Sequence, residues 1–247
     1  MKKTVVALSI LLLSTALFAE DFFGLVSLGT PEQVQAALAA GANLTARDAH
    51  GWTPLMRASR LTMNPSVIVL LVKAGARVSD RDADGWTALS VAARYNVRAE
   101  VIAALLQAGA DANDKDTQGE TPLMIAAGST ANAAVVALLL GAGARVNEQS
   151  GQGMTPLLLA AMLNALPDII TLLVRAGAVV DEKDRNGRTP LMLAARFNPN
   201  PAVVSALLAA GAERRLKSAE GKTAFDYARA NSSLKATRQY RELAGAR

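Results

Sequence analysis

The sequence has 247 residues, of which 51% are hydrophobic, and its formal net charge is +5. That apolar content is enough for one substantial buried core. Because the chain holds no cysteine and only one histidine, His50, its composition argues against disulfide frameworks, zinc sites and Ser–His or Cys–His catalysis.

Residues 1–19 have the pattern of a bacterial secretory signal peptide. Two lysines precede an apolar run from Thr4 to Leu17, and the small residues Ala16 and Ala19 mark its exit. The run is too short for a membrane span, and the pattern after it is that of a soluble protein. We expect cleavage after Ala19, with Ala16 as the competing site. Since no cysteine is present for lipid attachment, the expected location is the periplasm, with secretion as the alternative.

Residues 20–50 begin the predicted mature chain. Thr30 and Gln33 have the spacing of a capping box, which predicts that a helix starts after Thr30. The segment lacks the Thr-Pro-Leu sequence that recurs further along the chain. We therefore interpret it as an N-terminal cap on a repetitive structure.

The sequence that follows repeats itself with a period of 34 residues. Two separate glycine markers keep this period over most of the chain, which predicts a solenoid in which each unit packs only on its neighbours. The first marker is Gly51, Gly85, Gly119, Gly153, Gly187 and Gly221, and the second is Gly41, Gly75, Gly109, Gly143, Gly177 and Gly211.

The sequence of each unit predicts two helices followed by a polar turn. The first helix starts at a Thr-Pro pair such as Thr53-Pro54, with threonine as the N-cap and proline where no hydrogen bond is lost. The second helix is apolar at helical spacing, as at Val67, Leu70 and Leu71. It ends at the second marker glycine, which suits the left-handed position after a helix. The Asp-rich stretch beyond it predicts a turn or short hairpin.

The last segment, residues 221–247, replaces apolar surface with Lys, Arg and Gln, as a C-terminal cap does. Five full repeats then occupy residues 51–220, and 20–247 form a single domain. Residues 212–247 hold nine Lys/Arg against four Asp/Glu, so the basic charge belongs to this end of the chain. A solvated cap explains such a distribution better than the basic, aromatic-rich stripe of a nucleic-acid-binding protein.

These signals, with the phrases "GADAN", "DTQGETPLMIAA" and "VVALLLGAGA", resemble the ankyrin repeat over roughly residues 20–247. Tetratricopeptide repeats share the period but lack the Gly-x-Thr-Pro-Leu start. The resemblance implies an all-α-dominated repeat solenoid of helix-turn-helix-hairpin units with about seven helix pairs. The usual ankyrin unit has about 33 residues, and the one additional residue of the 34-residue units here falls between the two helices. The histidine usual after Thr-Pro-Leu is replaced by Met56, Ser90, Met124, Leu158, Met192 and Asp226.

The resemblance also implies that a partner protein binds a concave face lined by the turns and the first helices. We expect Trp52 and Arg60 on this exposed inner side, and Trp, Tyr and Arg are the residues that dominate interface energetics. The candidate partner-binding residues are Trp52, Arg60, Trp86, Arg94, Tyr95, Met162, Leu163, Arg188, Arg196 and Phe197.

Each kind of candidate has a structural alternative. A tryptophan after the marker glycine can pack on the neighbouring hairpin, and an arginine at the end of a helix is favoured by the helix dipole. The methionines at 56, 124 and 192 are predicted to be core residues.

The sequence predicts no catalytic, cofactor-binding or metal-binding residue. The glycines belong to turns rather than to a phosphate loop, and the Asp-rich turns lack the final glutamate of a calcium loop. We expect a non-enzymatic, monomeric protein-binding module with no nucleic-acid partner and no membrane span in the mature chain. Three roles stay open: a protective adaptor of an envelope enzyme of the oxidative-stress type, which is a resemblance only, an immunity-like inhibitor of a toxin, and a secreted effector acting on host proteins. The identity of the partner cannot be read from the sequence.

Overall fold

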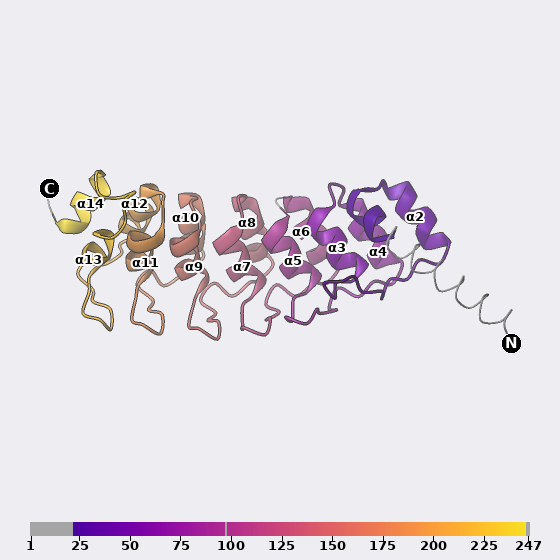
Figure 1. Ribbon diagram of the computed structural model, residues 1–247, viewed down its shortest axis with the longest axis horizontal. Helices are drawn as coiled ribbons and strands as arrows, with labels where there is room; N and C mark the ends of the chain where they lie inside the picture. The colour runs from indigo at the N-terminus through magenta and orange to yellow at the C-terminus, as the bar shows by residue number, and fades with distance from the viewer. Residues whose placement is uncertain (1–21, 97, 246–247) are drawn as a thin grey trace. The chain divides into compact units, whose positions relative to one another are not determined.

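The computed structural model describes residues 22–96 and 98–245. The predicted signal peptide and its cleavage sites lie outside the described residues. The chain forms two compact units, one up to Asp111 and one from Ala112 onward. Figure 1 labels the helices from which they are built. No helix in the described part of the chain is long and apolar enough to cross a membrane. That residues 20–247 form a single domain stays a prediction.

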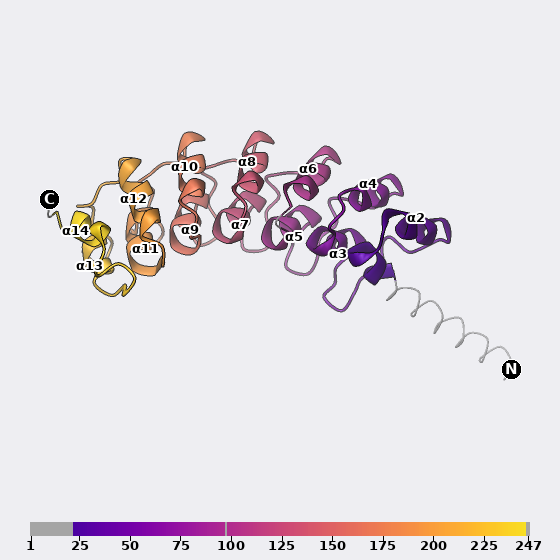
Figure 2. The same cartoon turned by 90° about the horizontal axis from the view of Figure 1, so that it is seen from above.

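The first unit has two rows of helices, which Figure 2 shows from above. Helix α3 packs against α5 in one row, and α4 packs against both α2 and α6 in the other. Residues 22–28 are also helical and pair in sequence with α2. The bounds are α2 (Pro31–Ala39), α3 (Pro54–Leu61), α4 (Ser66–Lys73), α5 (Ala88–Tyr95) and α6 (Ala99–Gln107).

The second unit continues the same alternation. Helices α7, α9, α11 and α13 pack successively in its first row, and α8, α10, α12 and α14 in its second. The bounds are α7 (Pro122–Ser129), α8 (Ala133–Gly141), α9 (Pro156–Leu163), α10 (Pro167–Arg175), α11 (Pro190–Phe197), α12 (Pro201–Ala209), α13 (Ala224–Ala228) and α14 (Arg238–Ala244). With residues 22–28, the described chain holds the seven helix pairs that the sequence predicts.

The local signals form the predicted caps. The hydroxyl of Thr53 accepts a hydrogen bond from the amide of Met56 at 3.3 Å, with Pro54 at the first helical position. Thr30 and Gln33 make both bonds of the capping box. Gly75, after α4, has a φ of +104°, a conformation that side chains with a Cβ rarely adopt.

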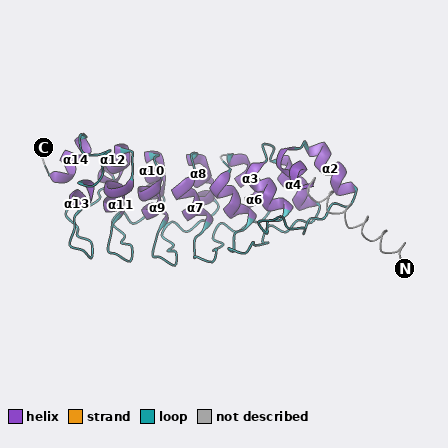
Figure 3. Cartoon of the chain, in the orientation of Figure 1, coloured by secondary structure: helices purple, strands orange, loops and turns teal. Residues whose placement is uncertain are grey.

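The predicted hairpins are loops without strands in the described residues (Figure 3). The amide of Asp48 donates to the carbonyl of Trp52 at 3.0 Å, and Gly51 donates back to Asp48 at 2.9 Å. The carboxylate of Asp48 closes the turn further, since its Oδ1 accepts from the amides of His50 and Trp52. Asp82, Asp116 and Asp184 close their turns in the same way, whereas Ser150 takes this place in another turn.

The core lies between the two rows of each unit. Met56, Met124 and Met192 are at most 1% exposed, which confirms their prediction as core residues. Alanines such as Ala126 and Ala160 are fully buried, so neighbouring first helices approach closely.

A buried asparagine between the two helices of a pair is the feature that the sequence analysis misses. Asn198 is fully buried, and its Nδ2 donates to the carbonyls of Ala161 at 3.0 Å and Asn164 at 2.8 Å. Its Oδ1 accepts from the amide of Asn200 at 2.9 Å. One side chain therefore satisfies backbone groups of two successive repeats. The same arrangement is made by Asn96, Asn164 and Asn231.

Candidate functional site

In the first unit, the structure brings four candidates together around Tyr95, the last residue of α5. The ring of Tyr95 lies 6.2 Å from that of Trp52 and 6.1 Å from that of Trp86, measured between centroids. The guanidinium carbon of Arg60 lies 4.9 Å from the Tyr95 centroid and 5.5 Å from the Trp52 centroid. These distances are within the range of aromatic and cation–π attraction.

Trp52 is not exposed as the sequence analysis expects. Only 8% of its surface is accessible, and its indole Nε1 donates to Oδ2 of Asp82 in the next turn at 2.9 Å. The expectation of exposure is wrong because the indole packs on the neighbouring loop, where a carboxylate satisfies its buried N–H. Trp52 is thus a buried member of the cluster, against which Tyr95 and Arg60 pack.

The solvent-facing part of this cluster comes from the ends of α3 and α5. Tyr95 is 46% exposed, Arg94 beside it is exposed, and Arg60 and Trp86 are half-buried. Arg60 and Arg94 have no hydrogen bond or ion pair with any described residue, although both lie at the C-terminal ends of helices, where the dipole favours a cation. A tyrosine held among arginines is the kind of group that dominates protein interfaces.

In the second unit the candidates separate into two sets. Leu163 is 54% exposed at the end of α9, beside a half-buried Met162. Phe197 is 46% exposed, and Arg196 lies over its ring, with 5.0 Å from the guanidinium carbon to the centroid. Arg188 differs from both sets: it forms an ion pair of 2.7 Å with the buried Asp184, so its charge is neutralised inside its own turn.

Tyr227 in α13 is a part of the second set that the sequence analysis does not single out. Arg196 lies 5.5 Å from its ring, and its hydroxyl shares a hydrogen bond with that of Ser218 at 3.0 Å. The C-terminal cap departs from the repeat pattern at this point, so the pattern does not indicate an aromatic residue beside Arg196. An acid is nearby: the pKa of Glu220 is lowered, chiefly by its hydrogen bond from Lys222 and to a lesser degree by Arg196.

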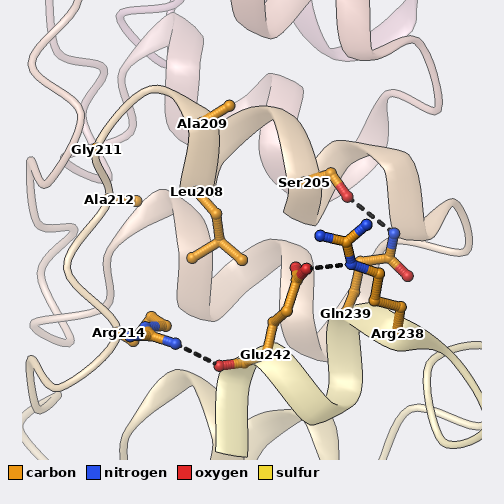
Figure 4. Close-up of a pocket in the computed structure, with 9 residues that line it drawn as sticks. All are labelled: Ser205, Leu208, Ala209, Gly211, Ala212, Arg214, Arg238, Gln239 and Glu242. Carbon is orange, nitrogen blue, oxygen red and sulfur yellow. Dashed lines mark hydrogen bonds and ion pairs between the residues drawn. The ribbon is translucent and has the colours of Figure 1, made fainter. Parts of the chain in front are cut away.

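The basic C-terminal cap lines a shallow cleft of about 590 Å³ between α12 and α14 (Figure 4). Its polar groups bond to one another. Arg238 pairs with Glu242 at 2.6 Å, Gln239 donates to Ser205 at 2.8 Å, and Arg214 donates to the carbonyl of Glu242 at 2.7 Å. The first pair lies within α14, and the bonds of Gln239 and Arg214 attach α14 to α12 and to the loop after it, so the cleft has a structural explanation.

No group of three or more His, Cys, Asp or Glu side chains in the described ranges could hold a metal ion. A comparison with protein families decides the class of the molecule. The family described as "Ankyrin repeats (3 copies)" matches residues 23–116, 64–150, 96–184 and 157–239. The chain belongs to the ankyrin repeat family.

Ankyrin repeats form protein–protein interaction modules, and the family is generally non-catalytic. Among curated proteins, none matches this ankyrin repeat chain. The exposed residues at its first-helix ends, with the half-buried Arg60, are therefore the candidate site: Tyr95, Arg60 and Arg94 in the first unit and Leu163, Phe197 and Arg196 in the second.

Proposed function

We propose that this ankyrin repeat protein is exported to the periplasm and binds another protein through its first-helix ends without catalysing a reaction. The observation that carries the proposal is the Tyr95 cluster, in which an exposed tyrosine is held in place by two tryptophans and an arginine. Single exposed apolar residues are ordinary on protein surfaces, but a supported aromatic among unpaired cations is an anchor for a partner.

Rigidity favours this use of the cluster. Binding normally costs free energy because interface side chains lose rotamer freedom, about 0.5–1.5 kcal/mol for each one. The rings of Trp52 and Tyr95 already restrict Arg60, and Trp52 is fixed by its bond to Asp82. The cluster is therefore preorganised, and its side chains lose less rotamer freedom when a partner binds.

The periplasmic location rests on the N-terminal sequence, with its two lysines, apolar run and small residues before Glu20. N-terminal sequencing of protein from the envelope fraction should start at Glu20, or at Leu17 if the alternative site is used. Recovery of the protein in the cytoplasm with Met1 intact would contradict export.

Site-specific photo-cross-linking tests the binding surface. A benzophenone amino acid at position 95 should yield a discrete protein adduct in living cells. The matched control is position 69, because Val69 is 40% exposed on the second-helix row of the same unit. Equal adducts from both positions, or none from position 95, would refute the proposed surface.

The trapped protein also separates the roles. As an adaptor, which is the role we propose, the protein should leave a bound envelope enzyme active. Inhibition of a trapped toxin would instead identify an immunity-like inhibitor, and a trapped host protein an effector.

A further inference from the structure

The guanidinium of Arg60 is held but not neutralised. Its two neighbours, Trp52 and Tyr95, offer ring faces at 5.5 and 4.9 Å, and no described residue accepts a hydrogen bond from it. A guanidinium that lies over aromatic rings keeps its N–H groups in its own plane, where a carboxylate can bind two of them at once. Arg60 thus has the geometry of a donor site that can bind a carboxylate.

The acids of the neighbouring turns already have partners. Asp82 accepts hydrogen bonds from the indole of Trp52 and from the amides of Asp84 and Trp86. Asp80 is paired with Arg77 at 2.8 Å. Arg57 is already paired with Asp48 at 3.3 Å. Arg94 is exposed and unpaired, and Arg98 uses its Nε on the sulfur of Met63 at 3.4 Å.

Apolar side chains lie beside these cations. Leu61 is 39% exposed, Met63 66% and Tyr95 46%. We call this surface the Arg60 patch and define it as Arg60, Leu61, Met63, Arg94, Tyr95 and Arg98. It combines positive charge with exposed apolar area, both from the ends of α3 and α5 and the loops that follow.

The equivalent arginine of the second unit does not share this property. Arg196 also lies over aromatic rings, those of Phe197 and Tyr227. Glu220 and Lys222, which form an ion pair of 2.6 Å, both interact electrostatically with Arg196. An acidic ligand at Arg196 would therefore meet a carboxylate as well as cations, whereas the charged members of the Arg60 patch are all cations.

We propose that the Arg60 patch binds an acidic segment of the partner protein, with an Asp or Glu carboxylate on Arg60 and apolar side chains on Tyr95, Leu61 and Met63. This inference rests on the proposed function and names the chemistry of its partner. An acidic peptide fits better than a nucleic acid or a lipid surface because residues 22–111 hold eight Lys/Arg against seven Asp/Glu. That balance lacks the broad positive field that a polyanion requires, while a few local cations suffice for a carboxylate.

Fluorescence anisotropy with two end-blocked peptides tests the proposal. One probe alternates glutamate with leucine and phenylalanine, and the other has glutamine in place of every glutamate. The purified protein should bind the glutamate probe at least about tenfold more tightly. Arg60→Gln and, separately, Arg94→Gln should reduce that preference, and Arg60→Lys should reduce it as well because lysine cannot bind bidentately. Lys73→Gln removes the same charge from the second-helix row and should leave the preference intact.

Several results would overturn the inference. These are equal binding of both probes, an equal effect of Lys73→Gln and Arg60→Gln, and tighter Arg60-dependent binding of single-stranded DNA or phosphatidylglycerol vesicles. Unchanged melting curves establish that the variants are folded, and Arg94→Gln gives a second reading if Arg60→Gln is unstable. If position 95 still cross-links to a protein while both probes bind equally, only the acidic partner is refuted. If cross-linking fails too, the proposed function falls with it.

Discussion

Replacement of Asn198 by alanine tests the part of the fold that holds successive repeats together. The side chain is fully buried and makes three hydrogen bonds, to the carbonyls of Ala161 and Asn164 and from the amide of Asn200. Asn198→Ala removes all three and leaves backbone groups without partners where water cannot easily replace them. At about 1 kcal/mol for each net hydrogen bond, the free energy of unfolding should fall by about 3 kcal/mol.

Asn147 provides a matched control in the same unit. Its Nδ2 donates to the carbonyl of Gly177 at 2.9 Å and its Oδ1 accepts from the amide of Val179 at 3.0 Å, so it too joins two repeats. Asn147 is exposed, and water can replace its bonds. Asn147→Ala should therefore cost about 1 kcal/mol or less. Urea unfolding followed by circular dichroism measures both variants, with attention to any second transition, since repeat arrays can depart from two-state behaviour.

Asn198→Asp adds a test in which the shape of the side chain is kept. The ionised carboxylate cannot donate at all, and the neutral carboxyl has one O–H in place of the two N–H groups of the amide. Burial favours the neutral form, so the pKa in the folded state should lie above that in the unfolded state. The sign then follows from linkage: relative to wild type, the variant should be least unstable at low pH and lose stability as pH rises through the folded pKa. A cost for Asn198→Ala no greater than that for Asn147→Ala, or an Asn198→Asp penalty independent of pH, would refute the account of the buried amide.

Three other predictions concern stability. Trp52→Ala should lower the free energy of unfolding, measured in urea, by about 3 kcal/mol or more because the indole is buried. Tyr95→Ala removes an exposed ring and should cost about 1 kcal/mol. The reverse order would contradict the burial of Trp52. Deletion of residues 153–186, one 34-residue period, should leave a folded protein with a lower unfolding midpoint, while deletion of half that length should abolish cooperative unfolding. The pKa of Glu148 is lowered, chiefly by the hydrogen bond from Lys115 and less by Arg145. Its small contribution to the free energy of unfolding is therefore present above its unfolded pKa and lost as pH falls. Glu148→Gln should flatten that part of the plot of stability against pH, and an unchanged plot would show that the pair contributes nothing.

The elements that sequence reasoning predicts are those with local physical causes. Gly75 adopts a left-handed conformation after α4, a requirement that restricts the residue type whatever surrounds it. Thr53 and Pro54 start α3 through groups within one helical turn. A repeated glycine and a repeated Thr-Pro therefore indicate the boundaries of helices without any knowledge of packing.

The remaining features depend on partners from another repeat. Trp52 is buried because Asp82 lies where it can accept the indole N–H, and nothing in the sequence around Trp52 reveals that contact. Asn198 is a residue type common in loops, and only its hydrogen bonds to the carbonyls of Ala161 and Asn164 make it a core residue. The charge of Arg188, by contrast, is neutralised within its own turn by Asp184, a carboxylate whose pairing the turn sequence does not reveal.

The repeat period also explains where chemistry specific to this protein can lie. Positions that cap a helix, end it or fill the core are restricted in every copy, because a substitution there disturbs the packing of two units. The last two residues of each first helix are free of that restriction, and they vary from copy to copy: Arg60-Leu61, Arg94-Tyr95, Gly128-Ser129, Met162-Leu163 and Arg196-Phe197. Leu61, Tyr95, Leu163 and Phe197 among them are exposed and Met162 is half-buried, so packing alone does not determine their identity. Variation at a solvent-facing position within a strict repeat is what recognition of one particular partner requires, and the unpaired Arg60 and Arg94 lie at this position.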